Sequence, residues 1–274
     1  MSEYRPFLKW AGGKRQLLPE LVGHVRRLRS FGAYHEPFVG GGALFFALFG
    51  LGAIRNGVVL SDVNSRLIEA YEGVARDVEE VIELLRHHAK KHSPEHFYAI
   101  RRQVPESVVE RAARIIYLNR TCFNGLYREN SRGEFNVPLG RYANPSICDE
   151  ATLRRAAAAL SSVTLAIRPF EAVLEMARPR DLVYFDPPYV PLSRTSSFTA
   201  YAQGGFAMPD QERLARVFAE LASRRVFVML SNSKTDSVVG LYGRFPIHTV
   251  LASRAVNSNA ERRGKIEEVI VTNF

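Results

Sequence analysis

The stretch VYFDPPY, residues 183–189, runs from a buried strand directly into a turn, and the rest of the chain can be interpreted from it. Its first three residues are apolar or aromatic, as in a strand buried inside a sheet. Pro187 and Pro188 cannot donate to a β-ladder, so they end the strand and stiffen the turn. Open α/β sheets bind ligands at the C-terminal ends of their strands, which makes Asp186 a candidate site residue. An ordinary strand-ending turn is the alternative.

Strand and helix signals alternate at both ends of the chain, which favours an α/β sheet covered by helices. Apolar runs predict strands at residues 34–38, 58–61, 163–167, 182–185 and 226–230, and two terminal strands at 246–251 and 267–272. Helical spacing covers residues 15–29 and 43–51. We therefore expect a mostly parallel sheet to which the terminal pair adds an antiparallel edge.

Between residues 64 and about 122 the strand signals disappear. Val74, Val78, Val81 and Leu85 lie three or four apart, which predicts one apolar face along a long helix. Further helices are expected from Ser93 onward and over residues 107–119. Residues 123–145 are rich in Asn, Gly and Arg and predict an ordered loop or short hairpin. The middle of the chain is thus a helical insertion.

Composition limits the kind of protein this can be. The 274 residues carry 37 Lys and Arg against 28 Asp and Glu, a formal net charge of +9, which suits a polyanionic partner or simply a basic surface. Two cysteines exclude a disulfide framework and a clustered-cysteine zinc site. No run approaches the ~18 apolar residues of a membrane span, and the charged start does not resemble a signal peptide. We expect a cytoplasmic protein without a membrane partner.

Two other strand ends carry unusual residues. The stretch EPFVGGG, residues 36–42, lets the backbone approach a ligand closely, although a tight turn is an alternative. The stretch VVLSDVN, residues 58–64, ends in Asp62, which could bind ribose hydroxyls or instead cap a helix. Neither G-x-G-x-x-G nor a phosphate-binding loop occurs. The pair therefore favours a nucleoside ligand of the adenosyl type over a pyrophosphate cofactor.

The turn after residue 185 suits a reaction on an aromatic amine. The carboxylate of Asp186 and a neighbouring carbonyl could together accept both hydrogens of an exocyclic amino group, and so direct its lone pair outward. Tyr189 offers a flat face on which a base could stack. Methyl transfer to such an amine needs proximity and electrostatics and no covalent intermediate.

The stretches DPPY, FVGGG (38–42) and FLKWAGGK (7–14) together resemble the Dam-type adenine-N6 DNA methyltransferases. The resemblance extends over nearly the whole chain, including residues 119–142, 191–206 and 254–270. It implies an α/β fold: a Rossmann-like, S-adenosylmethionine-dependent methyltransferase sheet with an inserted helical target-recognition domain. Residues 1–64 and 151–274 would form the catalytic domain, and residues 65–150 the DNA-recognition domain.

The resemblance also implies an activity, which is methyl transfer from S-adenosylmethionine to N6 of adenine in GATC on double-stranded DNA. It would proceed by base flipping and direct in-line attack. Asp186, Pro187 and Tyr189 would hold the flipped adenine. Contacts with the cofactor are assigned to Trp10, Lys14, Phe38, Gly40, Gly41, Gly42, Asp62, Phe170 and Asp186. For Phe170 a core phenylalanine is an equally good interpretation.

The family pattern assigns DNA contacts to ten residues, which are Lys9, Phe123, Asn124, Leu126, Arg128, Pro138, Arg141, Tyr142, Arg262 and Arg263. Lys9 and Arg128 would read base edges, and Leu126 and Pro138 would touch thymine methyls. Phe123 and Asn124 would insert into or beside the duplex, although a phenylalanine lacks the tyrosine hydroxyl of some members. Arg141 and Tyr142 would contact phosphate or sugar. Arg262, Arg263 and Lys265 would form a basic loop between the last strands, which would bind backbone or be a solvated charge run.

Two other interpretations stay open, an RNA-base or protein-amide methyltransferase and a DNA-binding module without catalysis. We expect no metal, because His87, His88, His92 and His96 have no cysteine or clear carboxylate partner and are interpreted as surface histidines. A monomer is expected.

Overall fold

The computed structural model describes residues 3–10, 12, 14, 16–189, 206–253 and 265–274. Seven strands form one sheet in the order β3-β2-β1-β4-β5-β7-β6. Their bounds are Tyr34–Glu36 (β1), Val58–Asp62 (β2), Val163–Ile167 (β3), Leu182–Phe185 (β4), Phe227–Ser233 (β5), Ile247–Ser253 (β6) and Lys265–Thr272 (β7). The succession 3-2-1-4-5 is that of doubly wound nucleotide-binding sheets, and the predicted α/β class is confirmed.

The central strands pair as the sequence predicts. β4 is parallel to β1, with Leu182 opposite Tyr34, and parallel to β5, with Phe185 opposite Leu230. β7 is antiparallel to both β5 and β6. The terminal pair is therefore antiparallel as expected, and the edge strand is β6 because β7 lies between it and β5.

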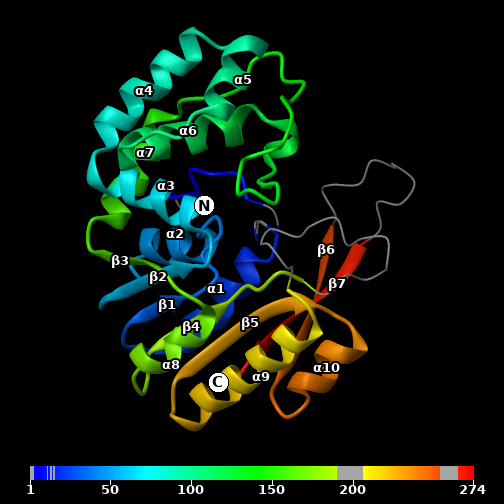
Figure 1. Cartoon of the computed structure of the whole chain (residues 1–274). Coiled ribbons are helices and arrows are strands. Elements are labelled where there is room, and N and C mark those ends of the chain that lie inside the picture. The colour runs from blue at the N-terminus through cyan, green and yellow to red at the C-terminus, as the bar shows by residue number, and fades with distance from the viewer. Residues whose placement is uncertain (1–2, 11, 13, 15, 190–205, 254–264) are drawn as a thin grey trace. The chain divides into compact units, whose positions relative to one another are not determined.

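The chain divides into two compact units, and the first comprises Met1–Gly13, Val39–Ala53 and Leu60–Arg168. Most of it is helical (Figure 1). The helices are α2 (Ala43–Gly50), α3 (Ser65–Arg76), α4 (Val78–Lys90), α5 (Pro94–Arg102), α6 (Val108–Thr121), the 3-10 turn η1 (Phe123–Gly125) and α7 (Glu150–Leu160). α6 packs against α3, α4 and α5, so it forms the centre of this helical group.

Polar caps decide where these helices begin. The side chains of Asn64, Asp77, Ser93, Ser107 and Asp149 each accept a backbone N–H in the first turn of the helix that follows. The prediction of one long helix through Val74 and Leu85 is wrong, because Asp77 ends α3 and caps α4 with a non-helical φ of −150°. The starts expected at Ser93 and Ser107 are confirmed. The loop expected after residue 122 contains only η1 and two isolated β-bridges among its described residues.

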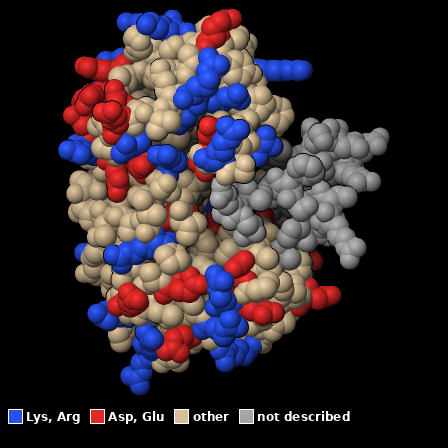
Figure 2. All heavy atoms as spheres, viewed as in Figure 1, with Lys and Arg blue, Asp and Glu red and all other residues tan. Residues whose placement is uncertain are grey.

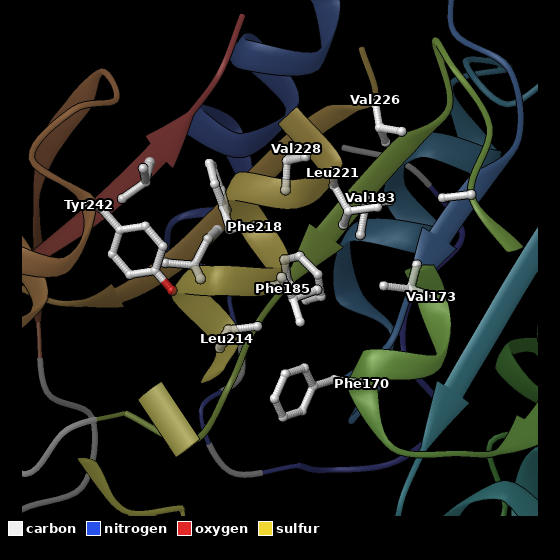
Figure 3. Packing of buried hydrophobic residues seen from close by; sticks show 14 of the residues in the cluster. Phe170, Val173, Val183, Phe185, Leu214, Phe218, Leu221, Val226, Val228 and Tyr242 are labelled. Carbon is white, nitrogen blue, oxygen red and sulfur yellow. The ribbon is translucent and has the colours of Figure 1, made fainter. Parts of the chain in front are cut away.

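The second unit comprises Lys14–Phe38, Ile54–Val59 and Pro169–Phe274. Its helices are α1 (Leu18–Arg27), the 3-10 turn η2 (Phe170–Ala172), α8 (Val173–Met176), α9 (Met208–Ser223) and α10 (Asp236–Tyr242). α9 packs on β5 and α10 packs on α9. Figure 3 shows the core between them, in which Phe185, Leu214, Phe218 and Val228 point toward one another.

This core fixes where β4 ends. Val183 and Phe185 are fully buried in the cluster. Tyr184, whose side chain points to the opposite face of the sheet, is 1% exposed. A strand buried on both sides cannot shift its register without exposing apolar area, so the position of the turn at residue 186 is strongly determined. No helix within the described ranges is long and apolar enough to cross a bilayer.

Candidate functional site

The carboxylate of Asp186, at the end of β4, is held by two donors of the second unit. Lys14 Nζ lies 2.8 Å from Oδ1, and Ser231 Oγ donates to the same oxygen at 3.0 Å. Tyr184 OH lies 2.8 Å from Ser231 Oγ and extends the network into the core. Both donors contact Oδ1, so the orientation of the carboxylate is fixed.

Burial and charge act in opposite directions on this acid. Burial raises the pKa of Asp186, while the ammonium of Lys14 and the hydroxyl of Ser231 lower it. Lys14 is only 6% exposed, so its charge is poorly screened by water. Burial has the larger effect, so the pKa of Asp186 lies above its ordinary value, and Lys14 and Ser231 limit this rise.

Tyr189 lies on the same turn and is fixed at both ends of its side chain. Lys14 Nζ sits 4.5 Å from the centre of its ring, and its hydroxyl donates to Glu268 Oε2 at 2.8 Å. Pro187 is buried and Pro188 is exposed. One lysine therefore contacts both Asp186 and Tyr189, two of the residues predicted to hold the target adenine.

Phe38 and Phe170 form a second group in this unit. Their rings stack with centroids 5.4 Å apart, and Phe185 and Phe206 meet Phe38 edge to face. Phe170 is 5% exposed and belongs to the hydrophobic cluster (Figure 3). Its ring is thus part of the core, and its contact with a cofactor stays a prediction.

The first unit holds the other predicted cofactor residues, beginning with Asp62 at the end of β2. Its carboxylate accepts the backbone N–H groups of Asn64 at 3.0 Å and Gly40 at 3.3 Å. Burial raises the pKa of Asp62 to about 6, against these hydrogen bonds. The cap of α3 is Asn64 and not Asp62, so helix capping does not account for the acid.

The glycine loop packs too closely for side chains. Gly40 and Gly42 have φ values of 47° and 66°, in the left-handed region. A Cβ on Gly40 would lie 3.0 Å from Trp10 Cδ1, and one on Gly42 would lie 2.8 Å from the hydroxyl of Tyr71. That hydroxyl donates to the Gly40 carbonyl at 3.0 Å. The loop, Trp10 and Asp62 therefore form one arrangement, which provides the close backbone approach and the carboxylate that the predicted adenosyl site needs.

Asn119, on the last turn of α6, joins the N-terminal segment to the predicted DNA-reading loop. Its amide accepts the N–H of Lys9 at 2.8 Å and donates to the carbonyls of Lys9 and Gly125 at 2.7 and 3.0 Å. A Cβ on Gly125 would lie 2.8 Å from Lys9 Cδ, so the lysine packs directly on this glycine. Lys9 and residues 123–125 are thus brought together by a single buried side chain.

The predicted DNA contacts of this unit are mostly exposed. Phe123 and Tyr142 are 48% and 37% exposed, and the side chains of Lys9, Asn124, Arg128, Pro138 and Arg141 are exposed as well, while Leu126 is half-buried. Lys9 Nζ lies 4.7 Å above the ring of Tyr142, and Arg128 Nε donates to Asn136 Oδ1 at 2.7 Å. Basic and aromatic groups are therefore presented by a loop with internal order.

Trp10 stacks on Tyr127 of the same loop, with centroids 5.3 Å apart. Tyr127 in turn donates through its hydroxyl to Glu129. The predicted cofactor residue and the predicted reading loop are thereby in direct contact within the first unit. Arg262 and Arg263, also predicted to bind DNA, lie outside the described residues, while Lys265, predicted to lie in the same loop, is the first residue of β7. On the face shown in Figure 2, Lys and Arg stand among Asp and Glu and do not form a single-sign surface.

The histidines of the insertion differ from the expectation of plain surface residues. His88, His92 and His96 are half-buried around Tyr117, with His88 Nδ1 3.0 Å from His96 Nε2 and His92 Nδ1 2.9 Å from the tyrosine hydroxyl. Only His87 is exposed, as predicted for all four. Among the described residues, no group of three or more His, Cys, Asp or Glu is arranged to hold a metal ion.

Sequence reasoning missed Asn119, Gln211, Ser231, Asn232 and Glu268 as site residues. Gln211, Ser231 and Asn232 are each fully buried. Their signal in the sequence is a polar residue at an apolar position of a helix or strand, since buried polar groups need specific partners. Which partners they would find could not be read from the spacing.

Comparison with known proteins places these motifs in a family context. Residues 10–256 match the family described as D12 class N6 adenine-specific DNA methyltransferase. The type II methyltransferase M1.LlaDCHI of Lactococcus lactis subsp. cremoris is 45% identical over 98% of this chain and 95% of its own. M.MjaIII of Methanocaldococcus jannaschii is 40% identical over 99% and 100%. The DNA adenine methylase of Escherichia coli (strain K12) is 35% identical over 98% and 95%.

Proposed function

The chain belongs to the D12 class of N6 adenine-specific DNA methyltransferases, and from this premise we propose that it modifies the adenine of GATC by base flipping and direct in-line transfer. Adenine-specific methylation of DNA with S-adenosylmethionine follows from the family. Membership also disfavours the RNA, protein and non-catalytic alternatives. The target sequence, the flipping and the roles of single residues are our proposals.

The observation that carries the chemical proposal is the arrangement around Asp186. Lys14 and Ser231 both contact Oδ1, and we propose that Oδ2 accepts an N–H of the target amine. A backbone carbonyl of the proline turn would accept the second hydrogen. With both hydrogens held, the lone pair of N6 points away from the turn. Lys14 favours the charged form of Asp186 against the effect of burial, and in that form the acid would act as an acceptor and orienting group.

A target adenine in a duplex cannot reach this turn while it is stacked, so we propose that it leaves the helix first. Tyr189 would then stack against it. The hydrogen bond to Glu268 and the ammonium of Lys14 already fix the ring in place, so little side-chain entropy is lost when the base arrives. Pro187 would add an apolar contact.

For the cofactor we propose nine residues, which are Trp10, Lys14, Phe38, Gly40, Gly41, Gly42, Asp62, Phe170 and Asp186. Asp62 would accept the ribose hydroxyls, and the glycine loop would leave room for the adenosyl group. When bound, S-adenosylmethionine supplies the electrophilic methyl group that the amine attacks without a covalent enzyme intermediate. We propose no role for a metal.

Residues 65–150 would act as the recognition domain between catalytic segments 1–64 and 151–274. Arg128 and Lys9 would donate to base edges, with Leu126 and Pro138 against thymine methyls. Phe123 and Asn124 would enter or border the duplex, while Arg141 and Tyr142 would contact the backbone. Arg262 and Arg263 would add backbone contacts. We further propose that the enzyme acts as a monomer in the cytoplasm.

The test uses purified protein with a labelled methyl donor and two duplexes of equal composition, one with GATC and one with the four bases scrambled. We expect label in the GATC duplex only, recovered as N6-methyladenine. Equal labelling of both duplexes would contradict the proposed target sequence without affecting the family activity. Label on cytosine would contradict the chemistry.

A further inference from the structure

A chain of buried amides runs from β5 to the proline turn. Asn232 on β5 donates through Nδ2 to Gln211 Oε1 at 3.0 Å, and Gln211 in the first turn of α9 donates through Nε2 to the Pro188 carbonyl at 3.1 Å. Both amide side chains are fully buried. The carbonyl they reach belongs to the same turn as Asp186.

The direction of each amide follows from its partners. A carbonyl only accepts, so Gln211 must present its NH2 group to Pro188 and its oxygen to Asn232. Asn232 then donates to Gln211, and its own oxygen accepts the N–H of Ser233 at 2.8 Å. Every step has one donor and one acceptor, so the chain has a single self-consistent orientation.

These polar groups lie in apolar surroundings. Leu214 and Leu230, neighbours of Gln211 and Asn232 along α9 and β5, are fully buried in the hydrophobic cluster. An amide buried here is stable only with its partners, because an unpaired buried polar group costs about 1–3 kcal/mol. Apolar side chains could join α9 to β5 equally well, so packing alone does not explain the amides.

The amides act on ψ of Pro188, the least restricted backbone angle of the two prolines. The rings of Pro187 and Pro188 fix φ at both residues, and ψ of Pro187 is restricted because a proline follows it. A hydrogen bond to the Pro188 carbonyl fixes the plane of the next peptide and hence ψ of Pro188. That plane determines where Tyr189 starts. Without the bond, the exposed Pro188 could turn its carbonyl toward water.

Adjacent residues of β5 therefore support both ends of the turn. Ser231 donates to Asp186 directly, and Asn232 reaches Pro188 through Gln211. Successive residues of a strand point to opposite faces, so one strand can hold the acid from one side and the second proline from the other.

We propose that Gln211 and Asn232 are positioning residues that fix Pro188 and thereby place Tyr189 relative to Asp186 for the target adenine. The inference rests on the proposed role of the turn. It concerns the rate of methyl transfer and not the binding of the cofactor, since Tyr189, whose position the amides would set, is not among the residues assigned to the cofactor.

The first test is Gln211→Met, which keeps the length of the side chain and removes the donor. Single-turnover transfer to the GATC duplex should fall about 10- to 100-fold, the scale of an ångström of misplacement near the reacting atoms. Cofactor affinity should stay within about twofold of the parent. The matched control is Leu214→Met, a volume-conserving change one turn along α9, which should keep the parent rate.

The second variant, Gln211→Glu, separates positioning from packing. A carboxylate can accept from Asn232 but cannot donate to Pro188, whereas the protonated acid can do both. The ratio of its rate to that of the parent should therefore rise as the pH falls. Hydrogen exchange of the backbone N–H groups of Asp186 and Tyr189 should be faster in Gln211→Glu than in the parent at high pH. Exchange of the backbone N–H groups within β4 should stay unchanged.

The outcomes separate this inference from the proposed function. Parent-like transfer by Gln211→Met, an equal loss in Leu214→Met, or a pH-independent ratio for Gln211→Glu would each overturn the positioning role. If one of these occurs while Asp186→Ala is inactive, only the inference fails. If Asp186→Ala remains active, the proposed chemistry of the turn fails first.

Discussion

Lys14 Nζ and Asp186 Oδ1 form a 2.8 Å ion pair in which the lysine is 6% exposed and the acid 21%. Removing one partner of such a pair leaves a poorly solvated charge, which is costly. The same lysine lies over the ring of Tyr189. Lys14 thus couples the charge state of the acid to the position of the aromatic ring, and the first prediction concerns this coupling.

Lys14→Met should move the acid limb of the kcat/KM profile to higher pH. Burial raises the pKa of Asp186 and Lys14 lowers it, so loss of the cation raises the pKa further and the charged form disappears at a higher pH. Lys14→Arg keeps a positive charge and should shift the limb less. An unchanged limb in Lys14→Met would show that the pair does not control the acid.

Arg128→Ala should relax discrimination at one guanine of the target by about 1–3 kcal/mol. The guanidinium is exposed and oriented through its bond to Asn136, as a group that reads a base edge would be. The measurement compares transfer to GATC and to duplexes with single substitutions. Arg141→Ala is the control and should weaken binding to all of them alike. If Arg128→Ala lowers transfer to all duplexes by the same factor, Arg128 contacts the DNA backbone and not a base edge.

Asn119→Leu should lower the free energy of unfolding by about 3 kcal/mol, because three backbone groups of Lys9 and Gly125 lose their partner. Chemical unfolding followed by the fluorescence of Trp10 would measure the change. The exposed Asn144, changed to Leu, should alter stability by less than about 0.5 kcal/mol. Equal effects of the two substitutions would argue against the linking role of Asn119.

The histidine group predicts a loss of stability in acid. Burial, and then the neighbouring His96 and His87, lower the pKa of His88 from 6.5 to about 4. A folded pKa below the unfolded one means that the unfolded chain binds more protons, so stability falls as the pH drops from about 6.5 toward 4. Burial lowers the pKa of His92 and His96 as well, and Lys91 adds repulsion at His96.

Unfolding measured between pH 7 and 5 would test this, with His88→Phe as the comparison. The substituted chain lacks one titrating group and the ring nitrogen that faces His96, so its stability should depend less on pH. The exposed His87, changed to Phe, should keep more of the parent slope. Identical slopes for His88→Phe and the parent would contradict the role of the group.

The sheet could be predicted from the sequence because buried strands leave a local signal. The run before Asp186 places β4 at residues 182–185, where the structure has it. Helix starts were predictable at Ser93 and Ser107, whose capping chemistry is local. The break between α3 and α4 at Asp77 was missed, because the helical spacing of apolar residues continues across it. A single capping residue is a weaker signal than that spacing.

The network around the turn could not be predicted. Lys14, Ser231 and Gln211 come from three distant parts of the chain, and only the packing of the second unit brings them to Asp186 and Pro188. Sequence motifs identified Lys14 and Asp186 through family resemblance, but no spacing rule pairs them. Long-range polar contacts of this kind depend on tertiary structure.

The most direct test of the central claim is single-turnover methyl transfer by Asp186→Ala on a GATC duplex, with DNA and cofactor at saturating concentrations. The substitution removes the acceptor for the target amine and leaves the DNA-reading loop unchanged. We expect transfer to fall below detection while the duplex is still bound with an affinity close to that of the parent. Transfer at a rate near that of the parent would contradict the account.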